Sequence, residues 1–505
     1  MHGRLPGTLF ALFALLTFTA GFTAFSGPSL ADTTPSLYQG QPAKYIFLFI
    51  GDGLGIPQRT AAEQFTGDKL VIDTFPAQGI TTTHANDRFI TGSAASATAM
   101  ASGVKTNINY IGVDPHYKPV KTLAEMAKEK DRKVGIISSV SIDHATPAAF
   151  YAHVKHRSMY HEVDHALVNS GFDFFGGGGL KDPAGERKKK KDPQAETLGD
   201  ALEVAAQNGY KVLTDKAEFM KLTAEDGKVI AYNAWLQDSG ALPYAMDRRQ
   251  EDISLAEFTA KAIEMLDNSE GFFIMVEGGK IDWACHANDG TAAIHDTVAF
   301  DNAVRQAVDF YKAHPDETLI VVSGDHECGG LTLGFAGTKY DSHFAFLGNQ
   351  KVSFQKFTDE VLKAYKDTCG GEFSFEDAKP LITENFGLKF DGDPKADPMV
   401  LEPFQVKMLQ EAFNRSMGGE EEASKNPETY LLYGGYDPLT ISLTHILNNK
   451  AGLGWTSFKH TGVPVSTSAM GVGAAIFNGY YDNTDIAKKI MSVMGVPAQV
   501  QYAAH

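Results

Sequence analysis

Near-continuous apolar runs, rather than alternating apolar and polar residues, recur along this chain. The clearest lie at residues 44–50, 133–140, 271–276 and 318–323. Runs of this kind are typical of strands that are buried on both faces of a parallel sheet. Helices are expected between them, for example at residues 198–206 and 255–266. This alternation predicts an α/β fold in which helices flank a central, mostly parallel β-sheet.

The pattern changes between residues 334 and 455, and we interpret this segment as a helical or mixed insertion packed over the sheet. Amphipathic helices are expected there at residues 354–365 and 404–413. The stretch with Asp391, Asp393 and Asp397 is better explained as a solvated loop than as a calcium site. No domain break appears elsewhere, so residues 32–505 are expected to form a single domain that contains the inserted subdomain.

The first 31 residues have the order of a secretory signal. Arg4 provides a basic start, residues 8–25 are apolar, and small residues follow at Ser29 and Ala31. Such a leader is removed on export. An uncleaved membrane anchor is the alternative, but threonine and glycine residues interrupt the apolar run. We therefore expect a signal peptide at residues 1–31, a periplasmic or secreted protein, and no stable membrane partner.

Acidic residues outnumber basic ones, with 62 Asp and Glu against 45 Lys and Arg and a formal net charge of −17. Nucleic-acid backbones are bound by clustered Lys and Arg, so no nucleic acid is expected as a stable partner. The basic run Arg187–Lys191 is interpreted as a solvated surface loop, with an anion or membrane contact as the alternative. The 3 cysteines are too few for a disulfide scaffold, and their odd number leaves at least one thiol unpaired without indicating whether the other two pair.

Carboxylates and histidines follow the predicted buried strands. Asp52 comes just after the first run, Glu277 after the third, and Asp325 with His326 after the last. Ligands of open α/β sheets bind at the carboxyl ends of the strands, so these side chains are candidates for one site. Each of them, taken alone, is equally explained as a turn residue or an ion-pair partner.

Three further residues extend this set. Asp282 and His286 share one face if the chain turns helical at Ile281, and this spacing lets two side chains reach one ion. A simple ion pair is the alternative. His460 lies in a compact Lys-His-Thr-Gly segment near the C-terminus. Oxygen and imidazole ligands without thiolates suit zinc together with magnesium, and paired divalent ions are a common device in phosphoryl transfer.

A stretch of small residues from Thr91 to Gly103 predicts a helix that packs closely against other backbone. Ser93 lies near its start, where the helix dipole is positive, and we interpret it as a nucleophile. A packed Ala/Ser helix without chemistry is the alternative for this segment alone.

A second helix is expected to start at Thr146 and Pro147, because threonine caps helices and proline tolerates their first position. That helix would carry His153 and Arg157 four residues apart on one face. Arg157 would then offer its planar guanidinium to a phosphate, with a surface ion pair as the alternative.

Seven short motifs occur together in a specific order. They are Ile50-Gly51-Asp52-Gly53, Ser93 to Ala99, His144 to Ala149, Val276-Glu277-Gly278, Asp282 to His286, Gly324-Asp325-His326 and His460-Thr461-Gly462. In these motifs the chain resembles the alkaline phosphatase family over nearly the whole mature sequence outside the insertion. The resemblance implies the same fold and the hydrolysis of small phosphate monoesters at alkaline pH, and it leaves room for a homodimer.

The resemblance also implies a set of ligands for each of three metal ions. Asp282, His286 and His460 would hold one Zn²⁺, and Asp325, His326 and a bridging Asp52 a second. Asp52, Thr146 and Glu277 would hold Mg²⁺. Ser93 would become a phosphoserine and Arg157 would clamp the phosphate, with the first zinc stabilising the departing alcohol. Both displacements need a deprotonated oxygen, so activity should rise with pH.

Three positions depart from the family pattern. Gly92 stands where many bacterial members have an aspartate that helps to hold the arginine. His144 and Trp283 stand where some members have Asp and Lys near the magnesium, which leaves the third ion open. Cys328 lies near the predicted ligand pair and could act from a second shell. Two alternatives remain for the function, namely a phosphodiesterase or related superfamily hydrolase with the same metals, and a metal- or phosphate-binding protein without turnover.

Overall fold

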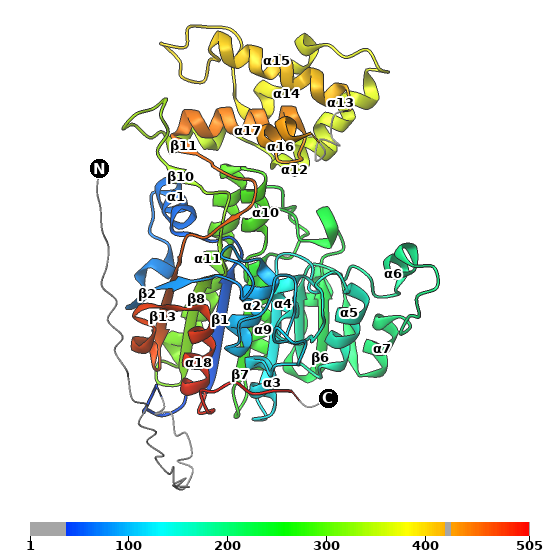
Figure 1. Ribbon diagram of the computed structural model, residues 1–505, viewed down its shortest axis with the longest axis vertical. Helices are drawn as coiled ribbons and strands as arrows, with labels where there is room; N and C mark the ends of the chain where they lie inside the picture. Colours follow the sequence, from blue (N-terminus) through cyan, green and yellow to red (C-terminus); the bar gives the residue numbers. More distant parts are fainter. Residues whose placement is uncertain (1–36, 420–425, 504–505) are drawn as a thin grey trace, which may run out of the picture. The chain divides into compact units, whose positions relative to one another are not determined.

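A ten-stranded sheet organises the protein in a computed structural model that describes residues 37–419 and 426–503 (Figure 1). Its strands lie in the order β14 (Gly479–Asp482), β2 (Ala77–Thr82), β13 (Val465–Gly471), β8 (Thr318–Gly324), β1 (Tyr45–Gly51), β7 (Phe272–Glu277), β3 (Lys133–Ser138), β4 (Phe174–Gly177), β6 (Lys228–Tyr232) and β5 (Tyr210–Leu213). Only β13 runs antiparallel to its neighbours in this sheet. The prediction of a mostly parallel sheet is confirmed.

Helices flank the sheet, as predicted. They are α1 (Ile56–Thr66), α2 (Ser93–Ser102), α3 (Leu123–Lys128), α4 (Ala145–Ala148), α5 (Tyr160–Asn169), α6 (Glu186–Lys191), α7 (Ala201–Gln207), α8 (Lys216–Met220), α9 (Leu255–Leu266), α10 (Lys280–His286), α11 (Gly290–Ala313) and α18 (Asn483–Val493). Short 3-10 turns are η1 (Val71–Thr74), η2 (Ala224–Asp226), η3 (Asp238–Gly240) and η7 (Ala474–Phe477).

Strand β1 shows why the apolar runs are continuous. Its side chains alternate between two cores, because successive residues of a strand point to opposite faces of the sheet. Phe47 and Phe49 belong to the core that contains Phe300 of α11. Ile46 and Leu48 belong to the core that contains residues of α2 and α18. Both faces of the central strands are therefore covered, and an apolar residue is needed at every position.

Residues 334–455 form mainly helices. These are η4 (Phe344–Asn349), α12 (Phe354–Lys356), the π-helical η5 (Phe357–Leu362), α13 (Lys363–Thr368), α14 (Phe375–Phe386), α15 (Pro403–Met417), α16 (Pro427–Tyr433) and α17 (Pro438–Ala451). Strand β10 (Thr332–Leu333) pairs with β11 (Leu453–Gly454), so the segment leaves and re-enters the rest of the chain at one place. Helix α17 and η4 contact α11.

The prediction that one helix carries both His153 and Arg157 is wrong. Helix α4 begins after His144, its N-cap has no side-chain hydrogen bond, and it ends at Ala148. The chain then runs beside residues 109–112, where Arg157 N donates to Asn109 O at 2.8 Å. Backbone pairing with this neighbouring segment replaces the helical hydrogen bonds, so Arg157 is held by a loop.

Two smaller expectations also need correction. The basic run forms helix α6 rather than a loop, although none of its residues is buried, as expected for a solvated segment. The helix expected from residue 198 begins at Ala201. All 3 cysteines are free, and Cys285 and Cys328 are buried.

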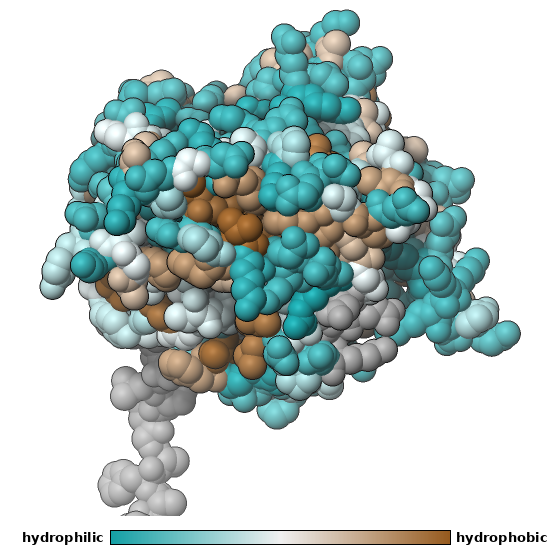
Figure 2. Space-filling model, turned by 90° about the horizontal axis from the view of Figure 1, so that it is seen from above, coloured by the Kyte–Doolittle hydropathy of each residue, from teal (hydrophilic) through white to brown (hydrophobic). Residues whose placement is uncertain are grey.

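The face seen in Figure 2 is largely hydrophilic, with apolar residues gathered in patches. Within the described residues, no helix combines the length and the apolar character needed to cross a membrane. The predicted signal peptide, residues 1–31, lies outside the described part of the chain.

A half-buried ion pair gives a first testable prediction. His153 Nε2 lies 2.9 Å from Glu125 Oε1. Burial opposes both charges, but the pair, together with hydrogen bonds to Thr122 and Gly112, outweighs it. The pKa of Glu125 therefore lies below and that of His153 above the ordinary value. The stabilisation is complete above the unfolded Glu pKa and below the unfolded His pKa, roughly pH 4.5–6.5. It is lost as pH falls through the folded Glu125 pKa or rises through the folded His153 pKa.

His153→Gln should therefore lower the free energy of unfolding by about 0.5–1 kcal/mol near pH 5.5 and by less near pH 9. Urea unfolding at both pH values measures this difference. The exposed His156 provides the control variant His156→Gln. An equal loss at both pH values would show that the pair does not carry the pH dependence.

Candidate active site

The candidate site lies at the carboxyl ends of β1, β7 and β8. Parallel pairing places Ile50 opposite Glu277 and Gly51 opposite Gly324, so the three strands end at one level. Asp52 follows β1, Glu277 is the last residue of β7, and Asp325 with His326 follows β8. The structure brings these four predicted residues together, and all of them are fully buried.

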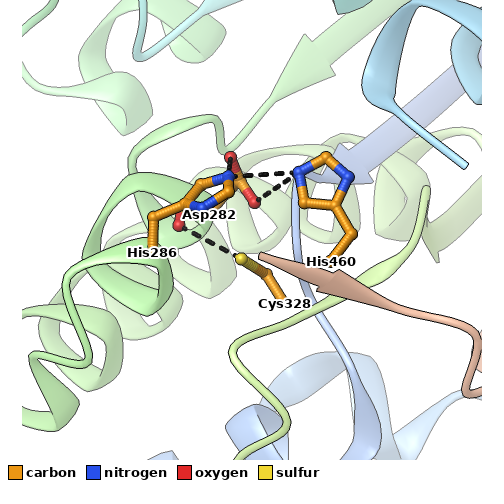
Figure 3. A group of neighbouring side chains, drawn as sticks. All are labelled: Asp282, His286, Cys328 and His460. Carbon is orange, nitrogen blue, oxygen red and sulfur yellow. Dashed lines mark hydrogen bonds and ion pairs between the residues drawn. The ribbon is translucent and has the colours of Figure 1, made fainter. Parts of the chain in front are cut away.

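The first group of side chains is Asp282, His286, Cys328 and His460, whose donor atoms lie within 4.8 Å of one another (Figure 3). Helix α10 places Asp282 and His286 on one face, as predicted. His286 Nε2 lies 3.3 Å from the Asp282 carboxylate and 3.1 Å from His460 Nε2. Strand β12 (His460–Thr461) pairs with β9 (Glu327–Cys328), which sets Cys328 opposite His460.

Backbone carbonyls orient both imidazoles of this group. His286 Nδ1 lies 2.6 Å from Phe458 O, and His460 Nδ1 lies 2.9 Å from Thr91 O. Carbonyl oxygens accept hydrogen bonds, so each ring donates from Nδ1 and, in its neutral form, turns the lone pair of Nε2 into the site. Burial favours the neutral acid of Asp282, but His286 and His460, when they are protonated, hold the pKa of Asp282 well below its usual range.

The second group is Asp52, Asp325 and His326. His326 Nε2 lies 3.3 Å from Asp52 Oδ1 and 3.3 Å from Asp325 Oδ2. Burial, followed by the neighbouring carboxylates, raises the pKa of both Asp52 and Asp325 well above the ordinary value. Burial also lowers the pKa of His326. Charges of one sign are crowded here, and a bound cation would relieve that cost.

The third group is Asp52, His144 and Glu277. His144 Nδ1 lies 3.8 Å from Glu277 Oε1. Ser138 donates to the other oxygen of Glu277. Sequence reasoning did not single out Ser138, because it is one polar residue inside an apolar run. The register of β3 and β7, which pairs Ser138 with Glu277, is the signal that reveals it.

Buried donor and acceptor atoms that have no hydrogen-bond partner among the described residues gather in these three groups. Such atoms are Asp52 Oδ1 and Oδ2, Thr146 Oγ1, Glu277 Oε1, Asp282 Oδ1, Asp325 Oδ2 and His326 Nε2. Buried polar atoms are rarely left unsatisfied in proteins, and each one costs about 1–3 kcal/mol. Oxygen and imidazole donors that lack partners and converge in three clusters fit divalent metal ions.

Ser93 is the first residue of α2, and Gly92 is the N-cap. The helix is fixed to the second group at one point, because Ser96 Oγ donates to Asp325 O at 2.7 Å. It is fixed to the first group through Thr91 O, which accepts from His460. The amide groups of the first helical turn have no helical partner and favour negative charge at this end. The prediction that Ser93 begins a helix is confirmed, and α2 is tied to both groups.

Arg157 contacts His144, with Arg157 Nη2 2.8 Å from His144 Nε2. Burial lowers the pKa of His144 to about 4, so this imidazole is neutral and accepts from the guanidinium. The ring of Trp283 meets that of His144 edge-on, with centroids 5.8 Å apart. The carboxylate of Asp143, the residue before His144, accepts a hydrogen bond from the backbone N–H of Lys181 at 2.6 Å.

Comparison with known proteins identifies the family. A family model described as alkaline phosphatase matches residues 43–496. Alkaline phosphatase 4 of Bacillus subtilis (strain 168) is 29% identical and the alignment covers 97% of each chain, and alkaline phosphatase 3 of the same organism is 30% identical over 89% of each chain. The cold-active alkaline phosphatase of a psychrophilic Shewanella sp. is 28% identical, with a TM-score of 0.71 over 89% of this chain and 99% of that one. The chain belongs to the alkaline phosphatase family, and its fold is that of the family.

Proposed function

We propose that this enzyme hydrolyses phosphate monoesters through a phosphoserine at Ser93 and depends on divalent metal ions. Membership of the alkaline phosphatase family supports monoester hydrolysis. The observation that carries the finer proposal is the convergence of unpartnered buried acids and imidazoles on the strand ends to which the start of α2 is fixed.

Each group of side chains fits one ion of the proposed set. Asp282, His286 and His460 would hold one Zn²⁺, and Asp52, Asp325 and His326 would hold a second. Asp52, Thr146 and Glu277 would hold Mg²⁺. When bound, these ions neutralise the buried carboxylates and stabilise negative charge on the oxygens that enter and leave phosphorus.

His144 is proposed to position Arg157 rather than to bind an ion. A neutral imidazole has one lone pair, and at His144 the lone pair of Nε2 accepts from Arg157. Nδ1 then carries the proton and faces Glu277. Arg157 is thereby linked to the third group through a single ring.

Two displacements at phosphorus follow from this arrangement. Ser93 Oγ gives up its proton and forms a bond to phosphorus, and the bond from phosphorus to the alcohol oxygen breaks, so the alcohol leaves after gaining a proton. A water molecule then attacks the phosphoserine, the bond to Oγ breaks, and Ser93 regains a proton as phosphate departs. The N-terminus of α2 favours the charged Oγ, and Arg157 donates to phosphate oxygens. Because both attacks need a deprotonated oxygen, the rate should rise with pH.

Assays on p-nitrophenyl phosphate and bis(p-nitrophenyl) phosphate, run side by side, test the choice of substrate. We expect the monoester to be hydrolysed far faster, with stoichiometric release of inorganic phosphate. A faster diester reaction would favour the diesterase alternative. Binding of zinc without any phosphate release would favour the non-catalytic one.

The missing carboxylate at Gly92 gives a prediction about product binding. A Cβ added at Gly92 would have Ile108 Cδ1 as its nearest neighbour, at 3.7 Å, so the first atom of a side chain meets no clash. Gly92→Asp should give Arg157 a charged tether beside the neutral His144 and tighten inhibition by phosphate. A charge-assisted hydrogen bond contributes roughly 1.5–3 kcal/mol, so the inhibition constant should fall by about tenfold or more.

Steady-state inhibition by phosphate measures this change, and Gly92→Asn controls for the loss of glycine without adding charge. Turnover should slow in Gly92→Asp if product release limits the rate. The same inhibition constant in wild type, Gly92→Asp and Gly92→Asn would show that position 92 does not determine the affinity for phosphate.

Export and assembly remain part of the proposal. A cleaved signal peptide at residues 1–31 and a periplasmic or secreted enzyme rest on the sequence of that leader, and a homodimer rests on the family resemblance. N-terminal sequencing of the mature protein and sedimentation analysis test these two points.

A further inference from the structure

A cavity of about 290 Å³ borders the first ligand group at His286. Aromatic side chains form much of its lining, at Tyr244, Trp283, Phe354 and Tyr436. We call this cavity the aromatic groove. None of these rings is among the groups assigned above to phosphorus chemistry, apart from the contact between Trp283 and His144. The groove is therefore a further feature next to the candidate active site that needs an explanation.

The rings of the groove hold one another at defined angles. Phe354 meets Tyr244 edge-on at a centroid distance of 5.6 Å, and it meets Tyr436 in the same way at 5.6 Å. Contacts of this geometry are favourable beyond simple burial. Phe354 and Tyr436 come from the segment 334–455, whereas Tyr244 and Trp283 precede it. The insertion thus completes a wall that the rest of the chain begins.

A buried lysine side chain packs against two of these rings. Lys280 is fully buried, and its Nζ has no hydrogen-bond partner among the described residues. Nζ lies 3.6 Å from the ring centre of Tyr244 and 5.0 Å from that of Trp283. Packing of the Lys280 side chain against both rings restrains them, so the groove is preformed.

The position of the groove points to the alcohol part of the substrate. His286 both borders the groove and belongs to the group at which, by the family resemblance, the alcohol departs. Asp238, Gln355 and Lys459 add polar groups to the lining. Tyr244 and Phe354 are buried, whereas Trp283 and Tyr436 are only half-buried and keep ring surface accessible. Half-buried rings beside polar groups suit a heteroaromatic ring, which stacks on aromatic side chains and also forms hydrogen bonds.

We propose that the aromatic groove binds the alcohol part of phosphate monoesters that carry a heteroaromatic ring, with nucleoside monophosphates as the substrate class. This inference rests on the proposed hydrolysis of monoesters at Ser93. It gives residues 334–455 a role in substrate selection through Phe354 and Tyr436.

A matched pair of substrates isolates the groove. Adenosine 5′-monophosphate and ribose 5-phosphate share the leaving oxygen, and only the first carries a heteroaromatic ring. We expect wild-type kcat/KM to be at least about fivefold higher for the nucleotide, the lower end of what one base–aromatic stack contributes. Tyr436→Leu should reduce this preference by lowering kcat/KM for the nucleotide several times more than kcat/KM for ribose 5-phosphate. Tyr340→Leu, at a fully exposed tyrosine of the same segment, is the control and should retain the preference.

Binding of adenosine, which has no phosphate, separates this inference from the chemistry at Ser93. Calorimetric titration of adenosine into Ser93→Ala should show binding that Tyr436→Leu weakens, whether or not the phosphoserine proposal holds. Activity on ribose 5-phosphate reports that each active variant is folded. Equal kcat/KM for the two substrates in wild type, or a preference that Tyr436→Leu leaves intact, would overturn the proposal. If the wild-type enzyme hydrolysed neither substrate but still bound adenosine, that result would instead count against the proposed function.

Discussion

Replacement of Ser93 by alanine is expected to lower kcat for a phosphate monoester by about a thousandfold or more, while bound zinc stays unchanged. The hydroxyl at the first position of α2 is the proposed nucleophile, and its removal leaves the groups of Asp52 and Asp282 intact. Steady-state assays and metal analysis of the same samples measure both parts of this expectation.

The matched controls are the other two serines of α2. Ser96 Oγ donates to Asp325 O, and Ser102 Oγ donates to Thr98 O, so both hydroxyls have structural partners. Ser96→Ala and Ser102→Ala should therefore keep far more activity than Ser93→Ala. Peptide mass spectrometry on acid-quenched enzyme should find the phosphate on Ser93. A phosphate on Ser96 or Ser102 would make the assignment wrong.

The central strands were predictable to within about two residues, because burial on both faces leaves little choice of residue type. The apolar run at 44–50 corresponds to β1 at Tyr45–Gly51, and the run at 318–323 to β8 at Thr318–Gly324. Since parallel strands end at one edge, the meeting of Asp52, Glu277 and Asp325 also followed from sequence.

The wrong helix prediction shows that residues near Thr146 determine where a helix begins but not how far it extends. Thr146 and Pro147 have the chemistry of a helix start, yet α4 spans only four residues, Ala145–Ala148. Pairing of Val154 with Ile111 holds the following chain in a loop. A partner 43 positions away in the sequence (154 − 111) decides this conformation, and the pattern around Thr146 carries no trace of it.

Contacts between distant segments also complete the site. The spacing of Asp282 and His286 was readable because one helix carries both. The approach of His460 to this pair depends on the pairing of β12 with β9, which joins residues more than a hundred positions apart. The contact of His144 with Arg157 and the assembly of the aromatic groove likewise arise only in the folded chain.

Removal of divalent metal should abolish turnover and also lower the thermal stability of the enzyme. In the folded protein Asp52, Glu277 and Asp325 are fully buried and close to one another, which is costly without a compensating cation. An ion that binds only the native state stabilises it by mass action, so its removal weakens folding as well as catalysis. We expect chelated enzyme to lose about 2.7 kcal/mol of unfolding free energy or more, the effect of a ligand present at about a hundred times its Kd.

Elemental analysis, melting temperature and monoester hydrolysis, each followed before chelation, after it and after return of zinc with magnesium, test this prediction together. Glu277→Gln should reduce bound magnesium and retain most of the zinc, because Glu277 belongs only to the third group. Asp301→Asn is the control, since that buried carboxylate accepts from Val71 N and Ile72 N, away from the ligand groups. It should leave metal content unchanged. Full activity and an unshifted melting temperature in enzyme shown to be free of metal would mean that the three groups of buried acids and imidazoles serve another purpose.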